Sequence, residues 1–225
     1  MLNCFKAYDI RGRLPDELNP DIAYRIARAY AKFLKPVCVV VGFDIRLSSK
    51  ELADAVIQGL VDSGVNVHNI GLCGTELVYF TTSFYNRDGG IMITASHNPK
   101  DYNGMKLVRE QSKPISGDTG LNEIKRLAEE NQFSDSKKGS VINADINEYY
   151  IKRLIDYINV KNLKPLKIVV NAGNGGAGLI IDLLEPHLKT IEFIKLHHEP
   201  NGEFPNGIPN PLLPENRPVS YTHLR

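Results

Sequence analysis

The residues that could do chemistry gather in one stretch, IMITASHNPKDYNGMKLV, at residues 91–108. Ser96, His97 and Asn98 follow an apolar run of strand type, and Pro99 fixes the backbone of the turn that they form. Ser96 is therefore expected at the end of a buried strand, where the sheet presents its hydroxyl beside other polar groups. The alternative is a plain Ser/Asn turn whose side chains bond their own backbone, which the tetrapeptide in isolation would favour.

A lysine further along the chain adds positive charge. Asn103-Gly104 is a signal for a tight hairpin, so the chain is expected to double back there and to place Lys106 near Ser96. A hydroxyl, an imidazole and an ammonium would then share one site. Serine hydrolysis is disfavoured because G-x-S-x-G is absent and an imidazole on the next residue is poorly placed as the base. Phosphoryl transfer fits better, since it needs positioned positive charge and a group to carry the phosphate.

The elements around this stretch alternate between helix and strand. A helix is expected from Pro20 to Pro36 with Asn19 as its N-cap, whereas YDIRG at residues 8–12 is expected to be a loop. This order predicts an α/β domain with its functional loops at strand ends. The other expected elements are a strand at 37–41, a helix at 48–64 capped by Ser48 or Ser49, a strand at 65–71, a helix capped by Thr75 and a strand at 89–96.

The second half repeats this order. The polar residues 131–146 have little periodicity and are expected to form an exposed connector. The unit stops after two strands, too little sheet to cover both faces of its helices. The sequence therefore predicts a first domain at residues 1–140 and an incomplete second α/β domain at 141–225. Its expected elements are a helix at 145–158, a strand at 166–170, a helix at 177–188 and a strand at 190–197.

The charge balance gives no reason to expect nucleic acid or an anionic membrane as a partner. The 225 residues include 27 Lys and Arg against 26 Asp and Glu, a formal net charge of +1. Cys4, Cys38 and Cys73 contain no C-x-x-C pair and indicate neither a disulfide framework nor a thiolate zinc site. No apolar run suits a membrane span or a signal peptide, so a cytoplasmic location is expected.

Three segments together resemble the phosphohexomutase superfamily. They are CFKAYDIRG at residues 4–12, TASHNPKDYNGMKLVRE at 94–110 and PNGIPNPLLPE at 205–215. The likeness is greatest to the bacterial phosphomannomutase branch and runs from about residue 3 to residue 215. The resemblance implies the first domain of that superfamily, with a mixed sheet between helices, followed by part of the second.

The resemblance also implies roles for individual residues. In that family the serine of TASHNP is a phosphoserine that gives its phosphoryl group to a hexose phosphate, which corresponds to Ser96. Arg11 and Lys106 would offset the charge of the phosphate, and Lys106 or His97 would move the proton of the accepting hydroxyl. The implied catalytic residues are Ser96, His97, Arg11 and Lys106, and the implied substrate-binding residues are Tyr8, Arg11 and Asn98.

Family members hold Mg²⁺ beside the phosphoserine with a D-G-D-x-D-R loop, and a hexose bisphosphate activates them. This sequence contains neither that loop nor the G-E-x-S loop that selects sugar hydroxyls. Ser96, through its phosphate, is therefore the one metal ligand expected here. The chain is expected to be an inactive fragment of a four-domain enzyme, and the tail RPVSYTHLR after Glu215 departs from the family.

The implied activity is that of an intramolecular phosphotransferase, an isomerase. It would interconvert mannose 6-phosphate and mannose 1-phosphate through a phosphoserine enzyme and a hexose bisphosphate. Two alternatives stay open: a phosphoglucomutase of the same superfamily, and a non-catalytic module that binds a phosphosugar or a nucleotide. The sequence decides neither the sugar nor the oligomeric state.

Three other patterns have simpler explanations than a functional site. The glycines of NAGNGGAG at 171–178 match a dinucleotide fingerprint, but a tight turn from strand to helix explains them better. The histidines at 197–198 are expected on opposite faces of an extended segment. Asp44 and Arg46 in GFDIRLSS are equally consistent with a structural loop pair and with a support for the catalytic floor.

Overall fold

The computed structural model describes residues 1–134 and 136–216. The terminal RPVSYTHLR, residues 217–225, lies outside the described residues. The chain divides into two compact units. The first unit consists of residues 1–96 and 101–144, and the second of residues 97–100 and the described residues from 145 onward.

A mixed six-stranded sheet in the order β1-β5-β4-β2-β3-β6 forms the centre of the first unit. Strand β5 runs antiparallel to both of its neighbours, whereas β2 is parallel to β3 and β4, and β3 is parallel to β6. The mixed α/β fold expected from the sequence is confirmed. The strands are β1 (Ile10–Arg13), β2 (Cys38–Phe43), β3 (Asn66–Leu72), β4 (Gly89–Ile93), β5 (Tyr102–Arg109) and β6 (Val141–Asn143).

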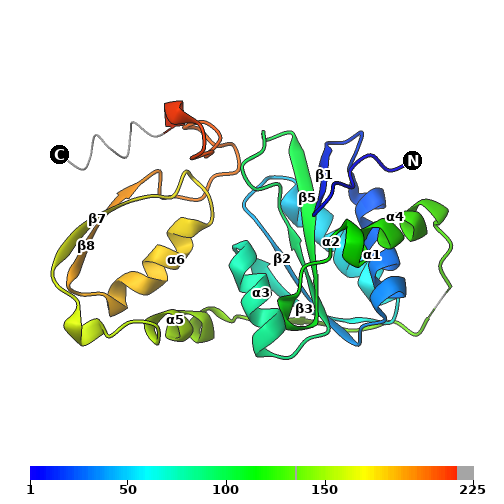
Figure 1. The fold of residues 1–225 in the computed structure, drawn as a ribbon, viewed down its shortest axis with the longest axis horizontal. Coiled ribbons are helices and arrows are strands. Elements are labelled where there is room, and N and C mark those ends of the chain that lie inside the picture. The colour runs from blue at the N-terminus through cyan, green and yellow to red at the C-terminus, as the bar shows by residue number, and fades with distance from the viewer. Residues whose placement is uncertain (135, 217–225) are drawn as a thin grey trace. The chain divides into compact units, whose positions relative to one another are not determined.

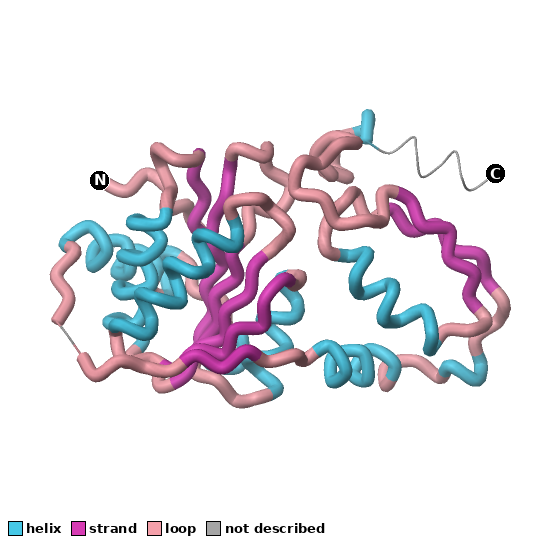
Figure 2. Tube along the Cα trace, turned by 180° about the vertical axis from the view of Figure 1, so that it is seen from behind, coloured by secondary structure: helices cyan, strands magenta, loops and turns pink. Residues whose placement is uncertain are grey.

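Helices cover both faces of this sheet. Helices α1 (Pro20–Leu34), α2 (Ser49–Asp62) and α4 (Leu121–Glu130) lie on one side, and α3 (Thr75–Phe84) lies on the other (Figure 1). Figure 2 shows the same two layers from behind. Apolar side chains between the sheet and the larger helical layer form the main core, and their removal from water is the chief favourable term in folding. They include Ile26, Leu52, Leu60, Ile91, Ile93, Met105 and Ile124.

Local sequence signals explain the first helix and the central strand. Asn19 is the N-cap of α1, and its side-chain oxygen accepts a hydrogen bond from the Ile22 N–H at 3.0 Å. In β2, residues 38–42 are all buried, as expected for a β-branched strand covered on both faces. The predicted helix cap is confirmed. The predicted strand is confirmed from residue 38, whereas Val37 precedes it and is 71% exposed.

Two edge strands contradict the sequence-based expectation. YDIRG is not simply a loop, because Ile10–Arg13 forms β1 and pairs with β5. The connector after α4 is likewise not entirely irregular, because Val141–Asn143 forms β6 beside β3. Both strands are too short to show a clear alternation of apolar and polar residues, and pairing with distant strands stabilises them.

The caps expected for the next two helices have different outcomes, since the first is right in position and the second is wrong. Ser48 occupies the N-cap of α2, but its side chain makes no capping hydrogen bond. Gly74 is the N-cap of α3, and Thr75 is its first helical residue. A serine or threonine near a helix start favours capping, but the backbone of the preceding loop decides which residue occupies the cap.

The second unit has the predicted order of elements. Helix α5 (Asn147–Ile155) is followed by β7 (Leu166–Asn171), α6 (Ala177–Leu184) and β8 (Ile191–Leu196), and β7 and β8 form a parallel two-stranded sheet. Pro186 lies in a 3₁₀ turn at Glu185–His187 that ends α6, in agreement with the expected effect of proline. Among the described residues, no helix has the length and apolar character needed to cross a membrane.

Candidate active site

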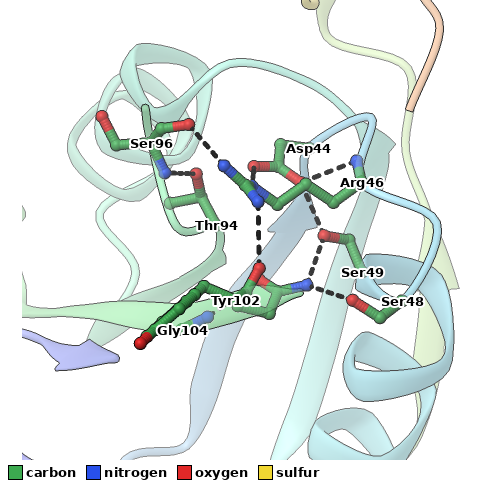
Figure 3. A network of polar contacts seen from close by, with 9 residues as sticks. Asp44, Arg46, Ser48, Ser49, Thr94, Ser96, Tyr102 and Gly104 are labelled. Carbon is green, nitrogen blue, oxygen red and sulfur yellow. Dashed lines mark hydrogen bonds and ion pairs between the residues drawn. The ribbon is translucent and has the colours of Figure 1, made fainter. Parts of the chain in front are cut away.

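Ser96 lies just beyond the carboxyl end of β4, and its backbone is held in an unusual conformation. Its φ of +54° is in the left-handed region, which costs a non-glycine residue about 1–2 kcal/mol. The Ser96 N–H donates to Thr94 Oγ1 at 2.9 Å, and its carbonyl accepts from Arg46 Nη2 at 2.9 Å. Figure 3 shows the Ser96 hydroxyl directed away from Arg46, and the residue is exposed. The fold therefore holds the backbone and presents the hydroxyl.

The loop after β2 supplies the support beneath Ser96. Arg46 Nη1 donates to the Tyr102 carbonyl at 3.0 Å, and Arg46 Nε lies 3.6 Å from Asp44 Oδ2. Ser49 Oγ donates to Asp44 Oδ1 at 2.5 Å (Figure 3). The structure thus places Arg46, paired with Asp44, against the Ser96 carbonyl, and a support for catalysis stays a prediction.

Arg11 and Lys106 come together around a carboxylate. Arg11 Nη2 donates to Asp9 Oδ2 at 2.8 Å, and Lys106 Nζ lies 3.9 Å from the same oxygen. All three side chains are partly buried, so their mutual attraction is screened less than that of exposed charges. Asp9 was not assigned a role from the sequence, although it stands between the two cations that the resemblance assigns to phosphate.

The register of β1 and β5 relates Arg11 to the serine segment. Arg11 stands opposite Gly104 in the β1–β5 pairing, and the Thr94 N–H donates to the Gly104 carbonyl at 3.0 Å from the other side. Neighbouring strands lie about 5 Å apart, so the backbones of Arg11 and Thr94 are separated by roughly 10 Å. A long arginine side chain on β1 can therefore serve a group carried near the end of β4.

Burial and charge shift the pKa of two groups near the site. Burial lowers the pKa of Arg46, and Asp44 opposes this shift. Burial raises the pKa of the Tyr79 hydroxyl on α3, and the Asp9 carboxylate raises it further. Both groups keep their ordinary charge near neutral pH, so Arg46 acts as a cation and Tyr79 as a neutral phenol.

The remaining predicted residues lie in more open places. Tyr8 is 80% exposed. His97 and Asn98 are half-buried and group with the second unit, although they directly follow Ser96 in the chain. The structure brings Ser96, Arg11 and Lys106 into one unit, whereas the roles of His97, Asn98 and Tyr8 stay predictions from the resemblance.

The expected hairpin turn at Asn103-Gly104 is wrong. Both residues lie inside β5, and the chain reverses earlier, between the end of β4 and Tyr102. The Asn103 side chain is fully buried, and its Nδ2 donates to Ser48 Oγ at 2.8 Å and to Ser49 Oγ at 2.9 Å. Asn103 thus ties β5 to the start of α2 rather than forming a turn.

A magnesium site requires oxygen ligands, carboxylates among them. In the part of the chain that the structure describes, no three or more His, Cys, Asp and Glu side chains cluster so that they could hold a metal ion. The nearby carboxylates are already engaged, Asp9 by Arg11 and Asp44 by Ser49. Mg²⁺ stays an implication of the resemblance.

Backbone geometry explains the glycine-rich turn of the second unit. Gly173 has a φ of +56°, which favours glycine. A Cβ at Gly178 would lie 2.2 Å from the His198 carbonyl oxygen, so this glycine allows α6 to pack closely. The His198 ring lies 2.8 Å from Asp182, Nε2 to Oδ1. These features account for the turn without a nucleotide.

Comparison with known proteins gives one consistent family. Residues 2–135 match the model "Phosphoglucomutase/phosphomannomutase, alpha/beta/alpha domain I", and residues 148–222 match domain II of the same family. A protein named phosphomannomutase from Escherichia coli is 56% identical over 224 residues, covering 96% of this chain and 49% of its own length. Proteins named phosphohexose mutases from Xanthomonas campestris are 56% identical over 217 residues, with 96% of this chain and 48% of their length covered.

Solved structures agree with these matches. A phosphoglucomutase/phosphomannomutase family protein from Burkholderia thailandensis superposes with a TM-score of 0.88 at 34% identity, covering 100% of this chain and 50% of that protein. A putative phosphomannomutase from Thermus thermophilus gives a TM-score of 0.81 at 25% identity, covering 100% of this chain and 52% of its own. The chain spans about half the length of the curated relatives that it matches.

Proposed function

This chain belongs to the phosphoglucomutase/phosphomannomutase family, and on that premise we propose that Ser96 carries the phosphoryl group that a phosphomannomutase exchanges with its sugar. The substrates are mannose 6-phosphate and mannose 1-phosphate, interconverted through a hexose bisphosphate. The observation that supports this most directly is the geometry of Ser96. Its peptide groups are bound on both sides while its hydroxyl points away from the supporting network (Figure 3).

The transfer step needs little covalent chemistry from the protein. A sugar hydroxyl attacks the phosphorus of the phosphoserine, and the bond from phosphorus to Ser96 Oγ breaks. Lys106 or His97 relays the proton, giving one to the departing Ser96 Oγ and taking up the one that the sugar hydroxyl loses. Arg11 and Lys106 offset the charge of the phosphate through charge-assisted hydrogen bonds. The bisphosphate then turns round, and Ser96 recovers a phosphoryl group from the other end of the sugar.

Asp9 gives the two cations a partner when no phosphate is present. Arg11 and Lys106 share its Oδ2 in the structure, at 2.8 and 3.9 Å. A dianion on Ser96 competes with this carboxylate for the same donors, because two negative groups attract the same guanidinium and ammonium. Asp9 thus keeps the cations placed between turnovers, and it limits how tightly they hold the phosphate.

The test uses a hybrid that adds the part of the relatives that this chain does not span. In this hybrid, called the joined protein, residues 1–216 of this chain replace the matching segment of the Escherichia coli phosphomannomutase. We expect it to convert mannose 1-phosphate to mannose 6-phosphate in a coupled assay, because the two sequences are 56% identical over this segment. The 225-residue chain alone, expected to show no turnover, is the control.

The same assay decides between the sugars. Glucose 1-phosphate in place of mannose 1-phosphate gives the ratio of kcat/KM values for the two substrates. A joined protein that is folded but turns over neither sugar would contradict the proposed function, provided that the unaltered Escherichia coli protein is active under the same conditions.

Lys106→Ala in the joined protein should lower kcat by about 100-fold or more and change KM little, because its charge and proton serve the transferring group. Steady-state kinetics with mannose 1-phosphate measure both constants. Lys113→Ala is the matched control: this lysine follows the far end of β5, is exposed and pairs with Glu110 at 3.4 Å. A higher KM at unchanged kcat would instead make Lys106 a residue of ground-state binding.

A further inference from the structure

The loop after β2 buries a charge that the proposed chemistry does not use. The Arg46 side chain is only 2% exposed. Charged side chains are almost never buried to this degree unless they are paired and hydrogen-bonded, because burial removes them from water. The contacts of Arg46 must therefore compensate for its desolvation, and they show what the residue holds in place.

Two of those contacts are backbone carbonyls on either side of the turn after Ser96. Arg46 Nη2 donates to the Ser96 carbonyl at 2.9 Å, and Nη1 donates to the Tyr102 carbonyl at 3.0 Å (Figure 3). The two carbonyls bracket residues 97–101, which connect β4 to β5. A planar guanidinium suits this task, because its N–H groups diverge in a fixed fork that one ammonium cannot reproduce.

The hydrogen bond to the Ser96 carbonyl fixes the conformation of the residue. The hydrogen bond from Arg46 to the Ser96 carbonyl fixes the orientation of the peptide plane that follows Ser96. The hydrogen bond from the Ser96 N–H to Thr94 Oγ1 fixes the peptide plane that precedes it. Together the two bonds hold Ser96 at a φ of +54°, which is unfavourable for a serine without such support. Relaxation to an ordinary conformation would displace Oγ, and phosphoryl transfer is sensitive to a misplacement of about 1 Å.

Arg46 is itself held by a second layer of polar groups. Asp44 Oδ1 accepts from the Arg46 N–H at 3.0 Å and from Ser49 Oγ at 2.5 Å, and Asn103 Nδ2 donates to Ser49 Oγ at 2.9 Å. Asn103 and Ser49 are both fully buried. The network joins the loop after β2 to α2 and β5, so three parts of the first unit position Arg46.

We propose that Arg46 is a positioning residue that clamps both ends of the segment 96–102 and so aims Ser96 Oγ for phosphoryl transfer. This inference rests on the proposed function of Ser96. Arg46 bonds the backbone carbonyl of the serine. Its replacement is therefore expected to lower kcat and the local rigidity of the segment.

Arg46→Lys tests the clamp, and Arg28→Lys is its matched control. Arg28 is 8% exposed, and it also donates through Nη2 to a loop carbonyl, that of Ser134 at 2.9 Å. Both substitutions keep the positive charge and remove the forked N–H groups of a guanidinium, and both residues lie in the first unit. They differ in which loop is held, so a general effect of replacing a buried arginine appears in both variants.

Hydrogen–deuterium exchange of the full 225-residue chain gives the first readout. Arg46→Lys should speed exchange of the amides in residues 96–102 by about tenfold or more. The lysine ammonium cannot bond both carbonyls as the guanidinium does, so local opening of the segment costs less free energy. Arg28→Lys should leave these amides unchanged. Asp44→Asn, which keeps the shape but removes the charge beside Arg46, should give a smaller effect on the same amides and serves if Arg46→Lys fails to fold.

Turnover of the joined protein gives the second readout. Arg46→Lys should lower kcat by about tenfold or more with KM nearly unchanged, and Arg28→Lys should change neither. Equal exchange in the two variants, or a loosened segment with unchanged kcat, would overturn the inference. If the joined protein with Arg46 intact shows no turnover, the proposed function fails, and the exchange data alone still decide whether Arg46 anchors the segment.

Discussion

Ser96→Ala should abolish turnover of the joined protein while the first unit stays folded. The change removes the oxygen that receives and returns the phosphoryl group in the proposed step. Ser96 is exposed, and its hydrogen bonds with Thr94 and Arg46 are made by its backbone, so alanine can make them too. The coupled assay measures turnover, and chemical denaturation measures the free energy of unfolding.

The matched control is another serine in the same backbone conformation. Ser112 has a φ of +59°, and Ser112→Ala also removes a serine hydroxyl, one that donates to the Tyr79 carbonyl and has no part in the proposed transfer. We expect it to retain turnover. After incubation with a hexose bisphosphate, mass spectrometry should find one added phosphoryl group on the peptide that contains Ser96, and none on that peptide of the Ser96→Ala variant. Turnover by this variant at the rate of the unaltered joined protein would end the phosphoserine assignment.

The parts of the fold that could be predicted from the sequence depend on local signals. Asn19 precedes Pro20 and an amphipathic repeat, so the cap and the helix are recognisable within one short window. Residues 38–42 are apolar without interruption, as in strands buried on both faces. Strand β1 has no comparable signal, since its four residues form a strand by pairing with residues 102–105, far along the chain.

The candidate site divides in the same way. Ser96, Arg11 and Lys106 follow from a resemblance in short motifs, which need no knowledge of contacts. The role of Asp9 depends on a lysine 97 positions away in the sequence, and the network of Arg46 depends on residues 50 and 56 positions away. Such contacts appear only once the register of the sheet is known, because one strand can pair at many offsets.

Gly104 lies in a strand, although the Asn-Gly pair that contains it predicted a hairpin turn. Asn-Gly is common in tight turns because glycine accepts a positive φ. Gly104 does not have a positive φ in the structure and lies inside β5, between β1 and the end of β4. Its function is to let neighbouring backbone approach: a Cβ there would lie 2.0 Å from the Ile10 carbonyl oxygen and 3.0 Å from that of Thr94.

Gly104→Ala should therefore lower the free energy of unfolding of the first unit by about 3 kcal/mol or more, the upper range for overpacking, because the obstacles are backbone atoms that cannot rotate away. Chemical denaturation of the 225-residue chain measures this loss. Gly117→Ala is the control: its Cβ would meet nothing closer than 3.4 Å, so the loss there should stay below about 1 kcal/mol.

The same substitution should also affect the joined protein at temperatures where it remains folded. Moving β1 or Thr94 away from residue 104 displaces Arg11 on one side and the anchor of the Ser96 N–H on the other. We therefore expect kcat to fall by about tenfold or more, as for other misplacements of catalytic groups. Equal unfolding free energies for the Gly104→Ala and Gly117→Ala variants would show that the strands yield easily, and would refute close backbone approach as the reason for glycine at this position.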